Sequence, residues 1–415
     1  MVCPAAPSWP VIRWNESGEE KSARWRSESG TPAPQKVVVA DDRMSADAAY
    51  RLACEGTALL WRGDFHNARQ LLQAMARRAD EKPRKRKNKE VVATPVEAFH
   101  LHRQAQSQRA RTLGMLLLPF AADHSIPLRR APDVRAACME AYGAATEPYV
   151  ASLRGLQGLI GAYEWRKNGV EIPALGARIH PHYGVFAPIR GEYIGLVNEA
   201  PLPELAGIPA SLTPTLSRQR EREQTNRCAN SLLSASRSVA FDIGTGTGVL
   251  AAMLARRGVA RIVATDQEPR ALACARENIA RLGLAERVEV FLADLFPEGR
   301  APLVVCNPPW IPARPSSPLE HAIYDPDSRM LLGFLNGLRM HLLPGGEGWL
   351  ILSDLAEHLG LRHRAELLAA IAAAGLQVIG RLDVKPHHPR SADASDPLHA
   401  ARAAELTSLW RLAMR

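Results

Sequence analysis

The segment FDIGTGTG, residues 241–248, combines a carboxylate with glycines at alternate positions. Asp242 is followed by Gly244, Gly246 and Gly248, which form a GxGxG pattern. Because glycine has no Cβ atom, the backbone can turn sharply there and come close to a bound ligand. The spacing differs from the GxGxxG of dinucleotide-binding dehydrogenases, and a glycine-rich turn alone does not identify one cofactor. The segment therefore predicts a ligand-binding loop, but it does not identify the ligand.

Two further carboxylates follow apolar stretches of the chain. Asp266 closes RIVATD, 24 residues after Asp242, and Asp294 follows RVEVFLA. A carboxylate at the first of these positions can accept hydrogen bonds from both hydroxyls of a ribose. A carboxylate at Asp294 can accept from an adenine amino group. Each aspartate alone fits a helix cap or a turn equally well, but three acids beside GxGxG favour a nucleoside-binding site.

The segment VVCNPPWIP, residues 304–312, is an unusual way to end an apolar strand. Pro308 and Pro309 stop the strand, because proline fixes φ and has no backbone N–H group. Asn307 places a side-chain amide before the two prolines, and Trp310 places a flat indole after them. A turn capped by the asparagine is the structural alternative. With GxGxG upstream, we favour a substrate-binding motif.

The order of the surrounding elements predicts where these residues meet. Apolar runs predict strands at 238–244, 261–265, 287–293, 302–306, 347–353, 376–384 and 404–413. Helical spacing predicts helices at 249–258, 270–283, 327–343 and 364–375. Alternation of helices with buried strands is typical of a doubly wound α/β fold with a mainly parallel sheet. Ligands of such sheets bind at the carboxyl ends of the strands, which is where the three aspartates and the asparagine fall.

The motifs FDIGTGTGVLAAMLA, ATDQEPRALACARENIARLGL, ADLFPEG and VVCNPPWIP resemble, in this order, those of class I S-adenosylmethionine-dependent methyltransferases. More narrowly they resemble the methyltransferase-small group, which includes glutamine methyltransferases of release factors and several rRNA base methyltransferases. The NPPW string also resembles the signature of adenine amino-methyltransferases. The resemblance covers about 178–200 and 238–415. It implies a seven-stranded Rossmann-like sheet and S-adenosyl-L-methionine as the cofactor.

The resemblance also implies a chemistry for the NPPW motif. Asn307 and the backbone carbonyl of Pro308 would accept the two hydrogens of a planar amino or amide nitrogen. Two fixed acceptors would turn the nitrogen lone pair toward the methyl group and stabilise the positive charge that develops. The prolines would hold the acceptors in place, with Pro309 beside the substrate, and Trp310 would stack on the flat acceptor. Relatives more often carry Tyr or Phe at this last position, which leaves the acceptor open.

Secondary candidates come from two segments near the motif. YGVFAPIRGEY resembles the segment that walls the cofactor and substrate sites in the family, which makes Phe186, Pro188 and Arg190 candidates for substrate binding. Tyr324 and Asp325 follow the motif on a loop expected to cover the pocket. Helix capping by Asp325 is an equal alternative for that residue. We expect no metal site, because His180 and His182 lack a third ligand at suitable spacing.

The first half of the chain lies mostly outside the resemblance. Residues 1–43 show no periodicity and are predicted to be a disordered extension, and translation starting at Met44 is an open alternative. Residues 44–165 carry helical spacing and predict a helical N-terminal domain, with a basic arm at 81–90. Residues 178–208 predict short strands, and the polar stretch 209–237 predicts a disordered insertion. Residues 238–415 form the predicted methyltransferase domain.

The overall charge allows, but does not require, a polyanionic partner. The formal net charge is +9, and together with the basic arm it leads us to favour a nucleic-acid base, in rRNA, as the substrate. A glutamine side chain in a translation factor is the alternative, followed by a small molecule or a non-catalytic RNA-binding role. Six cysteines without a CxxC pair and an N-terminus without a signal-peptide core predict a cytoplasmic protein without a membrane span.

Overall fold

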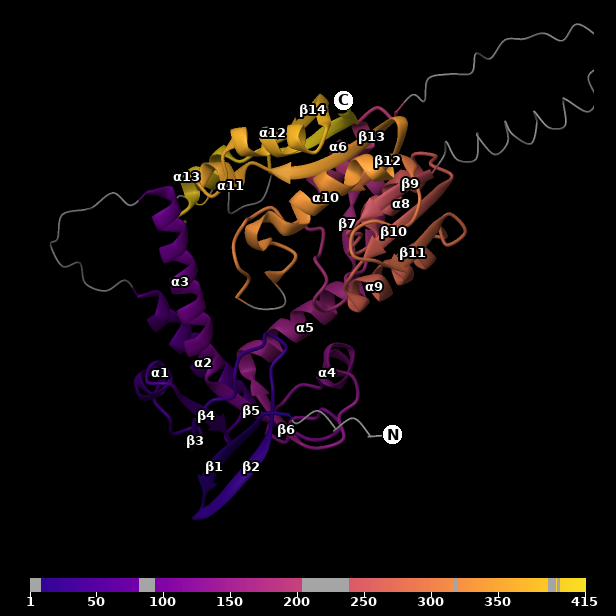
Figure 1. Cartoon of the computed structure of the whole chain (residues 1–415). Helices are drawn as coiled ribbons and strands as arrows, with labels where there is room; N and C mark the ends of the chain where they lie inside the picture. Colours follow the sequence, from indigo (N-terminus) through magenta and orange to yellow (C-terminus); the bar gives the residue numbers. More distant parts are fainter. Residues whose placement is uncertain (1–8, 82–93, 204–238, 317–319, 387–392, 394–395) are drawn as a thin grey trace, which may run out of the picture. The chain divides into compact units, whose positions relative to one another are not determined.

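The computed structural model describes residues 9–81, 94–203, 239–316, 320–386, 393 and 396–415. Over these residues the chain divides into two compact units (Figure 1). Unit 1 comprises Met1–Lys167 and Ser316–Leu319, and unit 2 comprises Asn168–Pro315 and Glu320–Arg415. Beyond Glu81, the predicted basic arm at 81–90 lies outside the described residues, as does the whole predicted insertion at 209–237.

Unit 2 is built on the predicted sheet, and all seven of its predicted strands are confirmed. They are β9 (Val239–Ile243), β10 (Arg261–Asp266), β11 (Val288–Leu292), β12 (Ala301–Cys306), β13 (Leu342–Ser353), β14 (Leu376–Val384) and β15 (Thr407–Met414). Their order is β11-β10-β9-β12-β13-β15-β14. The strands from β11 to β13 run parallel, and β15 is antiparallel to both β13 and β14.

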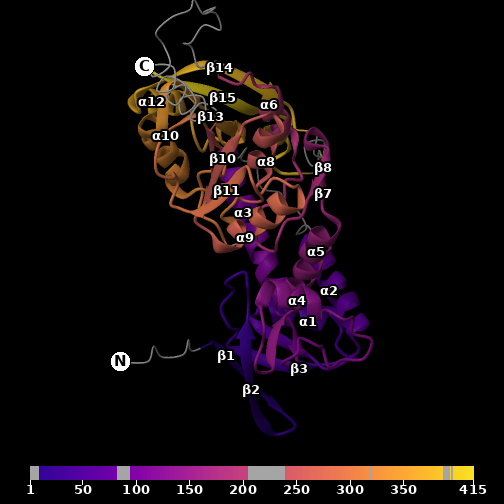
Figure 2. The same ribbon diagram turned by 90° about the vertical axis from the view of Figure 1, so that its right-hand side faces the viewer.

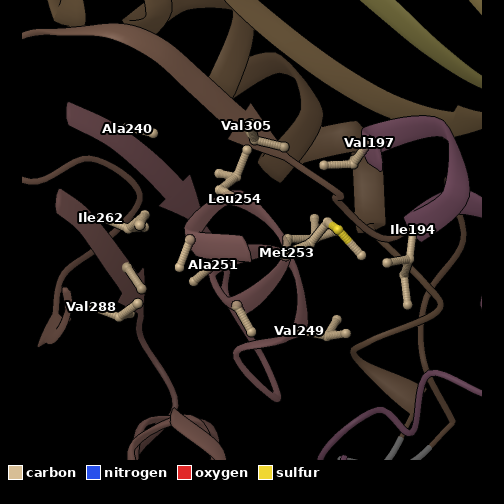
Figure 3. Packing of buried hydrophobic residues seen from close by; sticks show 14 of the residues in the cluster. Ile194, Val197, Ala240, Val249, Ala251, Met253, Leu254, Ile262, Val288 and Val305 are labelled. Carbon is tan, nitrogen blue, oxygen red and sulfur yellow. The ribbon is translucent and has the colours of Figure 1, made fainter. Parts of the chain in front are cut away.

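Helices cover both faces of this sheet (Figure 2). One face packs against α6 (Glu192–Glu199), α8 (Val249–Arg256) and α9 (Pro269–Arg281), and the other against α10 (Arg329–His341) and α12 (Arg364–Ala373). Figure 3 shows Met253 of α8 pointing toward Ile194 and Val197 of α6. Because the central strands are buried on both faces, their sequences are continuous apolar runs, which is why the pattern predicted them correctly.

The region before this sheet corrects one prediction. Residues 178–208, predicted as short strands, include one short strand and a helix. Strands β7 (Val170–Ile172) and β8 (Ala177–Ile179) form a separate two-stranded sheet, and α6 begins at Glu192. In GEYIGLVNE the buried side chains are Tyr193, Ile194, Leu196 and Val197, a helical spacing that the preceding turn formers obscured. Short elements η1 (Pro173–Leu175), η3 (Pro326–Ser328), α11 (Leu355–His358) and α13 (His399–Ala404) complete unit 2.

Unit 1 is a mixed α/β unit rather than a helical domain. Its sheet has six strands in the order β1-β2-β6-β5-β4-β3. These are β1 (Val11–Glu16), β2 (Glu19–Arg26), β3 (Lys36–Ala40), β4 (Thr57–Trp61), β5 (Leu116–Phe120) and β6 (Tyr149–Ser152). The helices are α1 (Ala46–Cys54), α2 (Phe65–Asp80), α3 (Pro95–Gly114), α4 (Arg135–Tyr142) and α5 (Leu153–Asn168).

Two predictions for the N-terminal half are therefore wrong. The extension predicted to be disordered at 1–43 contains β1, β2 and β3, and the domain predicted as helical at 44–165 contains β4, β5 and β6. The first three strands are only five to eight residues long; β1 and β3 alternate more and less exposed residues, and β2 is exposed over its first four residues, so their polar positions masked them. Strands β4 and β5 are five-residue apolar runs, which cannot be told from helix segments by periodicity. No helix in the described part of the chain could span a membrane.

Candidate active site

The glycine loop leaves the sheet at the end of β9 and enters α8. Gly244, Gly246 and Gly248 have φ angles of 70°, 56° and 79°, a region that other residues rarely adopt. The backbone N–H of Thr245 donates to the carbonyl of Thr265 on β10 at 2.8 Å, which ties the loop to the neighbouring strand. The glycines are thus required by the backbone conformation, as the GxGxG pattern predicted.

Asp242 lies beneath this loop and holds its shape. Its side chain is 1% exposed, and one carboxylate oxygen accepts from the Thr245 hydroxyl at 2.7 Å and from the Ala251 N–H at 3.0 Å. Burial raises the pKa of Asp242 to about 6, against the lowering effect of these two hydrogen bonds. We predicted a cofactor ligand at this position; its observed partners are the loop and the first turn of α8.

Asp266 closes β10 on the same side of the sheet. One of its carboxylate oxygens accepts from the N–H of Gly246 at 3.0 Å, and the other accepts from the N–H of Glu268 at 2.9 Å. Burial is the largest cause of the raised pKa of Asp266. Each carboxylate oxygen has a second lone pair, so the group keeps acceptor capacity for ribose hydroxyls while its backbone partners fix its orientation.

Asp294 sits in a different setting from the other two acids. Its side chain is 72% exposed and lies 3.8 Å from the guanidinium of Arg329. The adjacent Leu295 has a positive φ of 72°, and its carbonyl accepts from the Thr265 hydroxyl at 2.5 Å. This hydrogen bond joins the loop after β11 to β10. All three predicted acids thus lie at or just beyond the carboxyl ends of neighbouring parallel strands.

The loop leaves open backbone where a ligand would approach. A Cβ atom added at Gly246 would meet no heavy atom within 4 Å, whereas one at Gly244 would lie 2.4 Å from the Cε of Met330. Gly246 also donates to Asp266. An open glycine beside an oriented carboxylate is the arrangement that a nucleoside ligand requires.

The NPPW motif begins directly beside the glycine loop. Strands β12 and β9 are parallel neighbours, and Cys306 is paired with Ile243. Asn307 and Gly244 therefore leave the sheet side by side. Pro308 is buried, and Asn307 and Trp310 are half-buried. The indole Nε1 of Trp310 donates to Oδ1 of Asn307 at 2.8 Å, a contact that the sequence did not predict.

Arg190 reaches the motif from the segment before α6. Its guanidinium carbon lies 5.5 Å from the centre of the Trp310 ring, and its Nη2 donates to Oε1 of Glu405 at 3.0 Å. The same oxygen of Glu405 accepts from the Ser353 hydroxyl at 2.6 Å. The structure thus brings the predicted Arg190 to the motif and adds Glu405 and Ser353. Sequence reasoning missed both because neither belongs to a motif.

The other secondary candidates fall at the edge of this region. Tyr324 forms a parallel bridge with Ile311, which brings its backbone against the motif, and Phe186 is 40% exposed. Asp325 is buried and accepts from the N–H groups of Met330 and Leu331 at the start of α10, which supports the helix-capping alternative. Pro309 is half-buried between its motif neighbours.

The two histidines considered for a metal site both contact residues of α9. His182 contacts Glu277 at 2.7 Å through Nε2, and the His180 N–H donates to Asn278. Across the residues that the structure describes, no three histidine, cysteine or acidic side chains come together as a metal site would require.

Comparison with known proteins matches the part of the chain that carries these motifs. Residues 223–319 match the family model of ribosomal protein L11 methyltransferase (PrmA). A release factor glutamine methyltransferase of Cereibacter sphaeroides is 34% identical over 196 residues, which are 44% of this chain and 65% of that protein. A ribosomal protein L11 methyltransferase of Pelotomaculum thermopropionicum is 48% identical over 69 residues, 16% of this chain and 22% of that protein. Unit 2 carries a class I S-adenosylmethionine-dependent methyltransferase domain.

The chain covers less than two thirds of the length of either relative. Among solved structures, the ribosomal protein L11 methylase of Lactobacillus delbrueckii subsp. bulgaricus is 19% identical, covering 49% of this chain and 90% of that chain with a TM-score of 0.30.

S-adenosylmethionine is the cofactor of the methyltransferase domain. The open backbone at Gly246 and the carboxylate of Asp266 fit its nucleoside, and Asp242 supports the loop that would hold it.

Proposed function

We propose that this chain transfers a methyl group from S-adenosylmethionine to a planar nitrogen, and that the acceptor is the side-chain amide of a glutamine in a translation protein. The observation that carries the proposal is the pairing of β12 with β9. Cys306 opposite Ile243 puts the acceptor group of Asn307 next to the glycine loop that fits the cofactor. The acceptor nitrogen and the methyl donor would therefore bind at neighbouring strand ends.

The chain's own contribution to the reaction is hydrogen-bond acceptance and orientation. Bound S-adenosylmethionine supplies an electrophilic methyl group on a sulfonium. An amide nitrogen is a weak nucleophile, because its lone pair is delocalised into the carbonyl. The Asn307 Oδ1 has two lone pairs, and the Trp310 indole N–H occupies one of them. The second lone pair and the Pro308 carbonyl remain for the two amide hydrogens, which would hold the nitrogen in position and stabilise its developing charge.

Two observations support a glutamine as the acceptor. The relative of 34% identity is a release factor glutamine methyltransferase. Its alignment covers 196 residues and is therefore longer than the match to the L11 methyltransferase family model, which covers residues 223–319. Both this relative and the ribosomal protein L11 methyltransferase are described as methylating proteins of translation. The base amino group of an rRNA, which we favoured from the sequence, becomes the second candidate. The net charge of +9 supports it.

One labelling experiment separates these candidates. Tritium-labelled S-adenosylmethionine is added with purified protein to an extract of cells that lack the gene, and the variant Asn307→Ala serves as the control. Label that protease removes and nuclease does not would support the glutamine proposal, and peptide mass spectrometry would then locate a methylated glutamine. Label that nuclease removes would overturn it in favour of a base.

The control has its own requirement. Asn307→Ala must still bind S-adenosylhomocysteine, because no cofactor-binding role is assigned to Asn307, and it must lose the label. A salt titration adds an independent check, since affinity for an RNA substrate would fall steeply as the salt concentration rises. Absence of label in both fractions, with cofactor binding intact, would contradict both macromolecular substrates.

A further inference from the structure

Two arginines lie on one face of the unit 1 sheet. Arg24 and Arg26 are two positions apart on β2, so their side chains point to the same face of the strand. Strand β2 runs parallel to β6, with Arg24 paired to Tyr149. Trp25 points to the opposite face and packs in an apolar cluster with Trp14. The arginines thus lie on the opposite face of β2 from this apolar cluster.

Among the described residues, the acceptors around the two guanidinium groups satisfy only part of their N–H groups. The Arg24 side chain is 10% exposed, and its ion pair is a weak one: Glu147 lies 3.9 Å away and is itself 56% exposed. Within the described part of the chain, the Nε of Arg24 and the Nη1 of Arg26 are buried without a hydrogen-bond partner. The Nη2 of Arg26 donates to the carbonyl of Tyr142. A guanidinium has five donors, so both groups have N–H groups to spare.

Aromatic rings surround these cations in place of carboxylates. The Trp9 ring lies 3.6 Å from the Arg24 guanidinium carbon, and the Tyr142 and Tyr149 rings lie 4.3 and 5.5 Å from that of Arg26. Ring faces stabilise a cation, but less than a paired anion does. Trp9 is 52% exposed and precedes β1, so its ring is the part of the cluster that faces solvent.

The charge balance of the cluster favours an anion. Burying two neighbouring cations is costly unless a negative group compensates them. Burial and the neighbouring charge of Arg26 both lower the pKa of Arg24, the direction expected when two cations lie close together. Residues 1–8, which precede Trp9, contain no acidic side chain. Across the residues that the structure describes, the acidic partner of Arg24 is the exposed Glu147 at 3.9 Å, a weak contact that offsets little of the positive charge.

We propose that Arg24 and Arg26 form a binding site for a phosphate group, with Trp9 as its cover. A phosphate dianion matches two guanidinium charges and offers several acceptor oxygens, whereas a carboxylate carries one charge. The ligand would reach the arginines where the Trp9 ring now lies over Arg24. The phosphate could be inorganic phosphate, the monoester of a nucleotide or the diester of a nucleic acid. This site is independent of the proposed methyl transfer, because it lies wholly within unit 1.

Calorimetric titration with inorganic phosphate tests the proposal on the full chain. Saturating S-adenosylhomocysteine is present throughout, so that binding in the methyltransferase domain does not contribute. Wild-type protein is expected to bind phosphate, and Arg26→Gln is expected to weaken the affinity about 10- to 100-fold, as the loss of charge-assisted hydrogen bonds predicts. The matched control is Arg135→Gln, because Arg135 is a unit 1 arginine that is 58% exposed and paired with Asp133.

The outcomes are separable even if the arginine variant folds poorly. Absence of phosphate binding by the wild type would overturn the proposal, as would an equal loss of affinity in Arg135→Gln. Trp9→Ala provides a second variant, because an exposed residue outside the helices and strands is expected to be dispensable for folding. Faster phosphate association in Trp9→Ala would support the role of Trp9 as the cover. An unchanged association rate would overturn that role. Competition by AMP or by single-stranded RNA would then identify a monoester or a diester as the ligand.

Discussion

The indole N–H of Trp310 donates a hydrogen bond to the side-chain oxygen of Asn307 at 2.8 Å. This contact decides which way the Asn307 amide faces, because only its oxygen can accept from the indole. It therefore leaves the second lone pair of that oxygen at a defined place for a substrate N–H. In the proposed reaction, Trp310 would therefore be a positioning residue as well as a flat surface.

Trp310→Phe separates these two roles. Phenylalanine keeps an aromatic face but has no N–H donor, so the Asn307 amide would lose its orientation. We expect kcat to fall about 3- to 10-fold, the range that one neutral hydrogen bond supplies, while the affinity for S-adenosylmethionine stays unchanged. Steady-state kinetics with the identified acceptor and calorimetry with the cofactor give the two values. An unchanged kcat would show that the indole N–H does not orient Asn307.

Glu405 is expected to act on the same motif from a distance. It is 3% exposed and anchors Arg190, whose guanidinium lies over the Trp310 ring. Glu405→Gln keeps an acceptor for the Ser353 hydroxyl but removes the charge that holds Arg190. We expect lower stability together with a lower kcat at temperatures where the variant is still folded.

A buried ion pair in the same sheet provides the matched control. Glu347 is 6% exposed, pairs with Arg411 at 2.6 Å and accepts from the Trp349 indole, so it resembles Glu405 in its surroundings. Glu347 lies near the middle of β13, whereas Ser353, which contacts Glu405, is the last residue of that strand. Glu347→Gln should lose comparable stability and keep its kcat. A parallel loss of kcat in both variants would mean that Glu405 has only a structural role.

Gly246 tests whether the open part of the loop is the cofactor site. Alanine at its φ of 56° costs about 1–2 kcal/mol of backbone strain, yet no atom lies within 4 Å of the added Cβ. Gly283→Ala is the control, because Gly283 has a φ of 68° and equally open surroundings after α9. Both variants should lose similar stability in urea unfolding, and only Gly246→Ala should bind S-adenosylmethionine more weakly. Equal affinities would place the cofactor elsewhere.

The fold of unit 2 was predictable from the sequence because its strands and motifs are marked by short continuous stretches of the chain. The central parallel strands are mostly apolar, and Asn307 and Gly244 each follow such a strand, so their meeting at one sheet edge follows from topology. The strands of unit 1 are short: β1, β2 and β3 carry charged residues at exposed positions, and β4 and β5 are apolar runs that periodicity does not distinguish from helix segments. The pairing of Arg190 with Glu405 joins residues 215 positions apart, and a pattern of neighbouring residues does not predict such a contact.

Asp266 and Asp294 should differ in their importance although the sequence treats them alike. Asp266 is held by the N–H groups of Gly246 and Glu268, whereas Asp294 is 72% exposed. Hydrogen bonds to an exposed carboxylate compete with water and contribute little. Asp266→Asn is therefore expected to weaken S-adenosylmethionine binding about tenfold or more, and Asp294→Asn only a few-fold, in calorimetric titrations. The reverse order would show that the adenine contact dominates affinity.

The buried Asp242 predicts how stability depends on pH. Its pKa is raised from 3.8 to about 6 in the folded protein, so the folded state holds a proton that the unfolded state has released between these values. Stability must therefore fall as the pH rises from about 4 to about 6, by an amount on the order of 3 kcal/mol from this group alone. Below about pH 4 the buried carboxyl is protonated in both states and does not destabilise the folded protein. Above about pH 6 the buried carboxylate is charged, and the whole cost of burying its charge reduces the free energy of unfolding.

Asp242→Asn isolates this contribution. An asparagine oxygen can still accept from the Thr245 hydroxyl and the Ala251 N–H, since both hydrogen bonds go to a single carboxylate oxygen in the wild type. Urea unfolding at several pH values should give a free energy that falls less steeply in the variant between pH 4 and 6. The difference between the two proteins removes the titration of every other group. If the two curves stay parallel across this range, Asp242 titrates at its ordinary pKa and the loop tolerates its charge.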